Sequence, residues 1–190
     1  RRKAFSILLL MKEEISRSIE LSDGVTAQLE DSTLTVKGSK GEVKRQFLHP
    51  KVAITAEGNK ITLSVSKATK REKTLTLSFE SHIKNMVQGV QEPHEYKLKI
   101  CSGHFPMNVS VSGSEFTVKN FLGEAVPRKV TLPEGIEIKV DGDQVIISSP
   151  NIELAGQAAA KIESLCRITN RDRRIFQDGI FMTSKNGVAI

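Results

Sequence analysis

The sequence predicts an α+β protein made of two tandem homologous modules, each an antiparallel sheet packed with one helix. Short stretches in both halves alternate apolar and polar residues, which is typical of strands with one buried face. One longer stretch in each half carries apolar residues at helical spacing instead. These elements come in the same order in both halves, and the repetition indicates an internal duplication.

The predicted strands of the first half lie between Val25 and Val65, with turn residues between them. One of these turns, at residues 38–41 (Gly-Ser-Lys-Gly), is interpreted as a hairpin tip that is either a solvated turn or a phosphate contact. In the second half, alternating apolar residues run from Tyr96 to Ile147. Each set is expected to form one sheet.

A helix follows the strands of each half. The first begins at Thr69, because Thr69 and Glu72 match the S/T-x-x-E pattern of a capping box. The second begins after Asn151, a residue type favoured at the N-cap. The apolar stripes of the two helices are Leu75, Phe79, Ile83, Met86, Val87 and Val90 in the first, and Ile152, Ala155, Ala159, Ile162 and Cys166 in the second.

The two halves can also be aligned residue by residue. Residues 35–37 (Thr-Val-Lys) match residues 117–119, and the Gly-Glu pair at 41–42 matches the pair at 123–124, both at an offset of 82. We therefore expect four parts: an N-terminal extension at 1–10, a first module at 11–93, a second module at 94–170 and a C-terminal tail at 171–190. The apolar residues of the tail, Phe176, Ile180 and Phe181, either pack back on the second module or anchor the tail to a partner.

Several classes of protein are disfavoured by composition. The longest apolar run, residues 7–11, is far shorter than the roughly 20 residues that span a bilayer. Three basic residues precede it, but no small-residue cleavage site follows, so we expect a plain extension before Met11 rather than a secretion signal. Cys101 and Cys166 are too few for a disulfide framework, and reduced thiols are expected.

No cofactor, metal site or catalytic frame is expected. The Cys101–His104 pair has a C-x-x-H spacing, but a structural zinc site needs about four ligands and no second pair exists in the sequence. A Gly-x-Ser-x-Gly nucleophile elbow is also missing, so we do not expect an enzyme. One alternative stays open beside the nucleic-acid binding considered next. The chain could be a protein-interaction scaffold without an RNA role, with the acidic stretch from Glu134 to Asp143 as its partner face.

The charge balance favours an acidic partner. Lys and Arg number 28 against 22 Asp and Glu, which gives a net charge of +6 and a pI near 9.4. Nucleic acid is the commonest polyanion that such proteins bind. Aromatic residues are only 5% of the chain and Trp is absent, which disfavours binding to single strands by base stacking. Contacts of Lys and Arg with phosphates are therefore expected.

The second half supplies the main candidates for these contacts, because its arginines cluster and its lysines alternate with buried strand positions. The predicted RNA-binding residues are Lys97, Lys99, Lys119, Arg128, Lys129, Arg167, Arg171, Arg173 and Arg174. Lys40 and Lys44 of the first half are weaker candidates.

Several motifs resemble the family of universal large-subunit ribosomal protein six, called large-subunit protein nine in eukaryotes. They are residues 120–124 (Asn-Phe-Leu-Gly-Glu), 151–154 (Asn-Ile-Glu-Leu), 173–180 (Arg-Arg-Ile-Phe-Gln-Asp-Gly-Ile), 104–109 (His-Phe-Pro-Met-Asn-Val) and 36–38 (Val-Lys-Gly). The resemblance covers about residues 11–187, and the segment 171–181 is similar to the eukaryotic and archaeal form. The Ser39-Lys40 tip differs from the Pro-Arg pair that the family often has there.

This resemblance implies a structural component of the large ribosomal subunit that supports translation in the cytoplasm. It implies binding to large-subunit rRNA near the sarcin-ricin region and the stalk base, largely through the second module and the tail. Neighbouring ribosomal proteins are the implied protein partners, translation factors are expected nearby, and neither a membrane nor a small-molecule substrate is expected.

Overall fold

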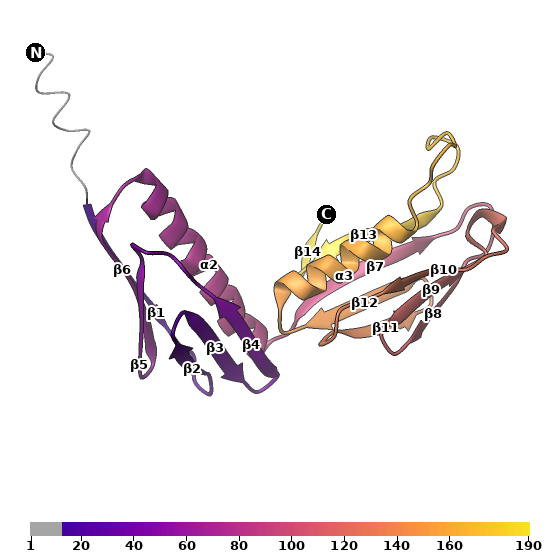
Figure 1. Ribbon diagram of the computed structural model, residues 1–190. Coiled ribbons are helices and arrows are strands. Elements are labelled where there is room, and N and C mark those ends of the chain that lie inside the picture. The colour runs from indigo at the N-terminus through magenta and orange to yellow at the C-terminus, as the bar shows by residue number, and fades with distance from the viewer. Residues whose placement is uncertain (1–12) are drawn as a thin grey trace, which may run out of the picture. The chain divides into compact units, whose positions relative to one another are not determined.

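The computed structural model describes residues 13–190, and the expected extension at residues 1–10 lies outside this range. The chain divides into two compact units, with the boundary between Glu92 and Pro93. Each unit combines antiparallel strands with one long helix, so the predicted α+β fold of two modules is confirmed (Figure 1). Neither described helix has the length and apolar character that a membrane crossing requires.

The first unit contains two three-stranded antiparallel sheets and the helix α2 (Lys70–Gln91). Its strands are β1 (Glu13–Glu20), β2 (Thr26–Glu30), β3 (Thr33–Gly38), β4 (Gly41–Gln46), β5 (Ala53–Glu57) and β6 (Lys60–Ala68). The strand orders are β1-β6-β5 and β2-β3-β4. The main core of the unit lies between the helix and the sheets, where Leu34, Ile61 and Ile83 have no solvent exposure.

Strand β1 lies before the first strand that the sequence predicts. Its apolar residues Ile15 and Ile19 are four positions apart, so it lacks the alternation that marks a strand. Pairing with β6 defines it instead, with Ile19 opposite Ile61 and Glu20 opposite Lys60. Pairing with β6, which is distant in the sequence, thus makes these residues a strand.

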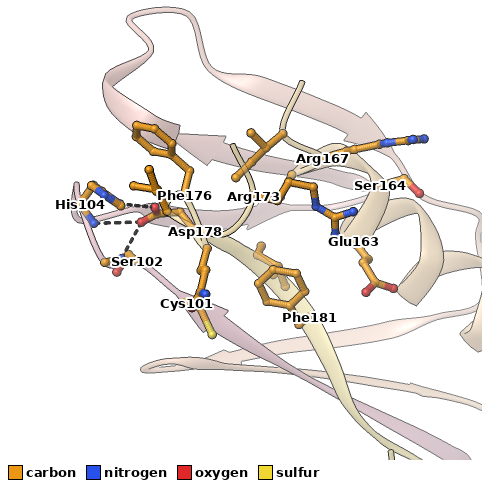
Figure 2. Close-up of a pocket in the computed structure, with 16 residues that line it drawn as sticks. Cys101, Ser102, His104, Glu163, Ser164, Arg167, Arg173, Phe176, Asp178 and Phe181 are labelled. Atoms are coloured by element: carbon orange, nitrogen blue, oxygen red, sulfur yellow. Dashed lines mark hydrogen bonds and ion pairs between the residues drawn. The ribbon is translucent and has the colours of Figure 1, made fainter. Parts of the chain in front are cut away.

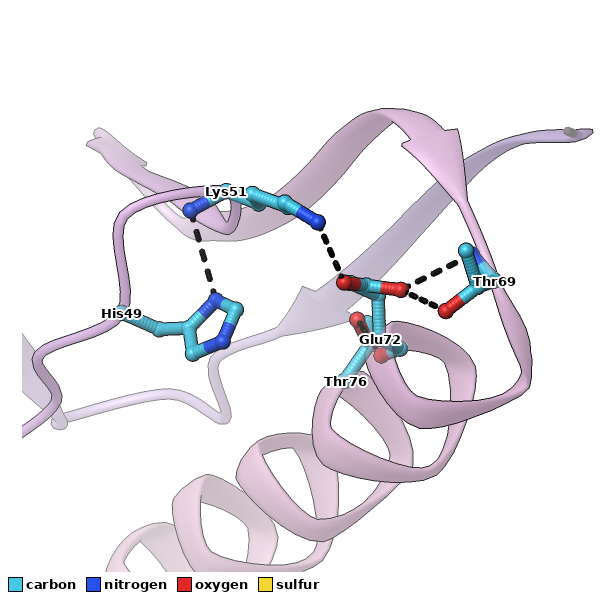
Figure 3. Close-up of polar contacts among 5 residues, drawn as sticks. All are labelled: His49, Lys51, Thr69, Glu72 and Thr76. Carbon is cyan, nitrogen blue, oxygen red and sulfur yellow. Dashed lines mark hydrogen bonds and ion pairs between the residues drawn. The ribbon is translucent and has the colours of Figure 1, made fainter.

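Helix α2 begins as predicted, with Thr69 as its N-cap (Figure 3). The Glu72 carboxylate accepts a hydrogen bond from the Thr69 backbone N–H at 3.0 Å and another from the Thr69 hydroxyl. Lys51 Nζ donates to the same carboxylate at 2.9 Å. The hydrogen bonds from Thr69 and Lys51 lower the pKa of Glu72 from 4.5 to about 2. This buried carboxylate therefore ties the start of the helix to the loop before β5.

The hairpin tip at residues 38–41 packs against the other end of α2. The Lys40 backbone N–H donates to the Val90 carbonyl at 3.0 Å. A Cβ atom on Gly38 would lie 2.8 Å from the same carbonyl oxygen, closer than such atoms approach. Gly38 is thus required for the close contact between hairpin and helix, a role that neither sequence interpretation of this tip included.

The second unit contains a five-stranded sheet, a three-stranded sheet, the 3-10 turn η1 (Phe121–Gly123) and the helix α3 (Ile152–Leu165). Its strands are β7 (His94–Cys101), β8 (Asn108–Ser112), β9 (Glu115–Lys119), β10 (Arg128–Thr131), β11 (Glu137–Asp141), β12 (Gln144–Ser149), β13 (Gly179–Lys185) and β14 (Val188–Ala189). The orders are β11-β12-β7-β13-β14 and β10-β9-β8, all antiparallel.

Helix α3 packs on β7, β12 and β13, and the Asn151 side chain caps it as predicted by accepting from the Glu153 N–H at 2.9 Å. Ala155, Ala159 and Ile162 of its predicted stripe are fully buried. Small side chains let the helix lie close to the sheet: a Cβ on Gly156 would meet the Tyr96 hydroxyl at 3.3 Å.

The tail adds two strands to the five-stranded sheet. Strand β13 pairs with β7, with Ile180 opposite Ile100, and β14 pairs with β13. Ile180 is 1% exposed, whereas Phe181 on the next position is 38% exposed. Of the two possibilities that the sequence left open, the structure therefore has the tail packed back on the module from Gly179 onward.

Candidate nucleic-acid interface

One segment carries most of the predicted cations. Residues 166–178 connect the end of α3 to β13, and they bear the exposed side chains of Arg167, Arg171, Arg173 and Arg174. Asn170 has a left-handed backbone conformation with a φ of 60°, which asparagine tolerates better than most residues. The chain thereby leaves the helix as a loop before it returns to the sheet (Figure 1).

Asp178 anchors the end of this loop to the segment after β7. Its carboxylate accepts hydrogen bonds from the backbone N–H groups of Gly103 at 2.5 Å and His104 at 3.0 Å. The third contact, at 2.6 Å, joins it to His104 Nδ1 (Figure 2). Burial by itself raises the pKa of Asp178, but the hydrogen bonds from His104 and Gly103 outweigh it, so the pKa lies below its ordinary value. The carboxylate is therefore ionised, and both of its oxygens contact Gly103 or His104.

A stack of three side chains supports the same loop. The rings of His104 and Phe176 lie 4.8 Å apart and nearly parallel, and the Arg171 guanidinium lies 4.9 Å from the centre of the Phe176 ring. Such cation–π contacts hold an arginine in place without neutralising its charge. His104 thus contacts both Asp178 and Phe176. Residues 13–190 contain no group of His, Cys, Asp and Glu side chains placed to hold a metal ion.

Arg128, a predicted RNA contact, forms hydrogen bonds with other residues of the second unit instead. It donates to both carboxylate oxygens of Glu124 at 2.8 and 2.6 Å, and to the backbone carbonyls of Leu165 at 2.8 Å and Arg167 at 3.2 Å. Its guanidinium also lies 4.3 Å from the centre of the Phe121 ring. The structure thus gives Arg128 the role of joining the η1 turn to the end of α3, where free carbonyls need donors.

Three further candidates take part in surface ion pairs. Lys97 lies 3.4 Å from Glu95, Lys129 lies 3.2 Å from Glu115, and Arg174 lies 2.7 Å from Asp172. Exposed pairs of this kind are weak and are broken readily by a stronger anion. The weaker candidates differ from each other, since Lys44 pairs with Glu42 at 2.9 Å whereas the Lys40 side chain is exposed at the hairpin tip.

Four candidates have no ion pair, side-chain hydrogen bond or ring contact with any residue in the described part of the chain: Lys99, Lys119, Arg167 and Arg173. Lys99 lies in β7 with its side chain exposed, as its alternation with the buried Leu98 and Ile100 predicts. These four cations are available to an anion without breaking an existing contact.

A cavity of about 970 Å³ lies beside Arg167 and Arg173, between the ends of β7 and α3, the loop and the start of β13 (Figure 2). Phe176 and Phe181 also line it. The Phe181 ring packs closely on Gly179, since a Cβ there would lie 2.9 Å from the ring. The cavity therefore combines aromatic surface with two guanidinium groups that have no partner among residues 13–190.

The other polar groups of the cavity are compatible with an anionic occupant. Burial raises the pKa of the Cys166 thiol to about 11, so the thiol is neutral. Asp178 has its charge satisfied by three hydrogen bonds, which leaves Glu163 as the exposed carboxylate among the described lining residues. Phosphate oxygens fit such a site, because arginine presents a planar fork of donors.

The sequence interpretation did not include Asp178, Phe176 or His104 in the site. Asp178 lies 74 positions from His104, and only the fold brings the two together. The signal available was an acid flanked by apolar residues 176 and 180, a position where an ionised group needs buried partners.

Fold and site together define a basic protein of two α+β units, whose second unit bears exposed arginines in one loop. The family model for ribosomal protein L6 matches residues 21–93 and 105–179, one match in each unit. The chain is 43% identical over 176 residues to the large ribosomal subunit protein uL6 of Methanocella arvoryzae, which covers 92% of this chain and 99% of that protein. The corresponding protein of Saccharolobus solfataricus is 40% identical over 179 residues, or 94% of this chain and 97% of that protein. The chain belongs to the ribosomal protein L6 family.

Proposed function

We propose that this chain is a structural component of the large ribosomal subunit and binds large-subunit rRNA through its second unit. Family membership supports the ribosomal role. The observation that carries the RNA interface is the pair of guanidinium groups without a partner among the described residues, Arg167 and Arg173, at a cavity where the ionised Asp178 carboxylate is already occupied by hydrogen bonds from Gly103 and His104.

Binding would rest on phosphate neutralisation and shape. Folded RNA exposes phosphates and 2′-hydroxyls, which fixed basic groups recognise without reading bases. The anchor at Asp178 and the stack on Phe176 hold the loop before RNA arrives, so little ordering entropy is lost on binding. In this proposal Arg167, Arg171, Arg173 and Lys99 contact phosphates first, and Arg174 follows when its pair with Asp172 opens.

The finer position comes from the family resemblance. We place the contact near the sarcin-ricin region and the stalk base, beside the docking site of translation factors, in cytoplasmic ribosomes. Lys97, Lys119 and Lys129 extend the proposed contact surface, whereas Arg128 acts by holding the Arg167 backbone. No catalytic step is assigned to the chain.

A binding measurement across salt concentrations tests the proposal. The full chain and a variant with Arg167→Ala and Arg173→Ala are titrated onto a large-subunit rRNA fragment. We expect weaker binding and a salt slope lower by about one for each lost phosphate contact. The control, Lys67→Ala with Lys70→Ala, removes the same charge from the first unit and is expected to leave the slope near that of the parent.

Two results would contradict the proposal: equal effects of both double variants, or an unchanged affinity and slope in the Arg167 and Arg173 variant. Sedimentation of the tagged chain through a sucrose gradient separates it from the scaffold alternative. Co-migration with the large subunit at high salt is expected for an rRNA-bound protein. The acidic face on β11, with Glu137 and Asp141 exposed, is the surface on which a scaffold would depend, and such a protein would leave the particles in mild salt.

A further inference from the structure

The two units share one strand plan except at one edge. The order β1-β6-β5 in the first unit corresponds to β7-β12-β11 in the second, and β2-β3-β4 corresponds to β8-β9-β10. Each set is followed by the helix of its unit. In the second unit, however, β13 pairs with the outer edge of β7, whereas no strand within residues 13–190 pairs with the outer edge of β1.

The direction of the free backbone groups on β1 follows from its pairing with β6. The Leu21 N–H donates to the Asn59 carbonyl at 2.9 Å, so the hydrogen-bonded positions continue at every second residue, Ile19 and Arg17. The residues between them, Ser18 and Ser16, therefore direct their N–H and C=O groups away from β6. Such an edge is a template for another strand.

A groove runs along this edge, between β1 and one face of α2. Two hollows of about 230 and 530 Å³ form it. The helix residues that line them are Lys73, Thr76 and Leu77 in the smaller hollow and Lys84, Val87, Gln88 and Gln91 in the larger one. Leu77 is 41% exposed, whereas Thr76 and Val87, which also line these hollows, are buried. The groove is the counterpart of the place that β13 occupies between β7 and α3 in the second unit.

We propose that this groove binds an extended segment of a protein neighbour, which adds to β1 as an antiparallel strand. Strand addition to an exposed edge takes its affinity from backbone hydrogen bonds and its specificity from alternate side chains. β13 supplies the template: Ile180 faces the helix and is buried, whereas Phe181 faces away. The incoming segment therefore has apolar residues at every second position, directed at Leu77 and Val87.

The charges of the groove add a further requirement. Arg17 and Lys73 line the same hollow, which also contains Glu14, and neither cation has an ion pair among the described residues. An acidic side chain on the incoming segment at this point would meet two cations and one carboxylate. This favours a protein segment with an acidic residue between its apolar positions.

Hydrogen exchange gives the most specific test. Exchange at single amides is compared between the free full chain and the chain within purified large subunits, with electron-transfer fragmentation to resolve neighbouring residues. The Arg17 and Ile19 amides, bonded to β6, are expected to exchange slowly in both. The Ser16 and Ser18 amides are expected to slow by at least about tenfold in the subunit only, since a strand would bond them there.

Variants and a crosslink identify the occupant. Ser18→Pro removes an outward N–H, a change that edge strands tolerate, and Ser18→Ala is the matched control that keeps it. Leu77→Glu charges the groove without altering β1. We expect the protection of Ser16 to be lost in Ser18→Pro and Leu77→Glu and kept in Ser18→Ala. A photoreactive p-benzoylphenylalanine at position 18 is expected to crosslink, in large subunits, to one extended segment of a protein.

Several outcomes would overturn the inference: no alternating protection, protection already present in the free chain, or a crosslink to RNA. Thermal unfolding of each variant checks that the first unit is folded. The outcome is separable from that for the rRNA interface, because Ser18→Pro leaves every proposed phosphate contact unchanged. The isolated Ser18→Pro chain is therefore expected to bind the rRNA fragment like the parent.

Discussion

At the scale of single residues, Asp178 connects folding to the proposed RNA interface. It is 2% exposed and accepts three hydrogen bonds, two of them from backbone groups of the opposite loop. We predict that Asp178→Asn lowers the free energy of unfolding by about 1.5–3 kcal/mol, the range for hydrogen bonds to a charged group. Because the arginine loop loses its anchor, rRNA affinity is expected to fall as well. Denaturant unfolding and RNA titration measure the two effects.

Asp172→Asn provides the matched control. Asp172 lies in the same loop, but it is exposed and pairs with Arg174 on the surface. Its replacement is expected to change stability by less than about 1 kcal/mol. An equal loss of stability in both variants would show that Asp178 is not the anchor described here.

Glu72 is expected to make the stability of the protein sensitive to acid. Hydrogen bonds from Thr69 and Lys51 hold its pKa at about 2, below the ordinary 4.5. Its contribution to stability is therefore complete above pH 4.5 and is lost as the pH falls from there toward 2, because the proton binds more tightly to the unfolded chain. We expect Glu72→Gln to be less stable than the parent at neutral pH and to lose less stability between pH 5 and pH 2.

Unfolding by urea at a series of pH values measures this difference. Glu57→Gln, at an exposed position at the end of β5, is the control and is expected to follow the parent curve. Parallel curves for Glu72→Gln and the parent would mean that the capping carboxylate does not contribute to acid sensitivity.

At the scale of elements, the contact between the β3–β4 hairpin and α2 depends on one missing side chain. A Cβ at Gly38 would lie 2.8 Å from the Val90 carbonyl oxygen, and backbone cannot move aside as a side chain can. We predict that Gly38→Ala lowers the free energy of unfolding by about 1–3 kcal/mol, the usual cost of overpacking. Thermal or urea unfolding of the full chain measures the effect.

Ser39→Ala, on the exposed neighbour of Gly38, is expected to be close to neutral. A neutral Gly38→Ala would show that the hairpin tip can leave the helix at little cost. The backbone hydrogen bond from Lys40 to Val90 holds this tip on the helix. If the tip came loose, the side-chain amine of Lys40 would also change its position.

At the scale of the whole molecule, each unit has its own core. The core of the second unit, around Leu98, Phe116 and Ile162, contains only residues after Pro93. We predict that a fragment of residues 93–190 folds alone with one cooperative unfolding transition and keeps the rRNA affinity of the full chain within about threefold. Circular dichroism and RNA titration test this. A fragment that is unfolded or binds much more weakly would mean that the first unit is needed.

The sequence by itself determined the duplication, both helices and their N-caps, because these depend on neighbours a few positions apart. Thr69 with Glu72, and Asn151 with Glu153, are local pairs whose spacing is visible in the chain. The clustering of arginines at 167–174 was equally visible.

The tertiary structure alone decided which cations are available and what holds them. Arg128 meets the end of α3, His104 meets Asp178, and β1 becomes a strand through β6, each across a long stretch of sequence. Composition cannot distinguish a paired guanidinium from a free one, because pairing depends on where folding places the acid. The open edge of β1 is visible only in three dimensions for the same reason: an edge is defined by the strand that does not lie beside it.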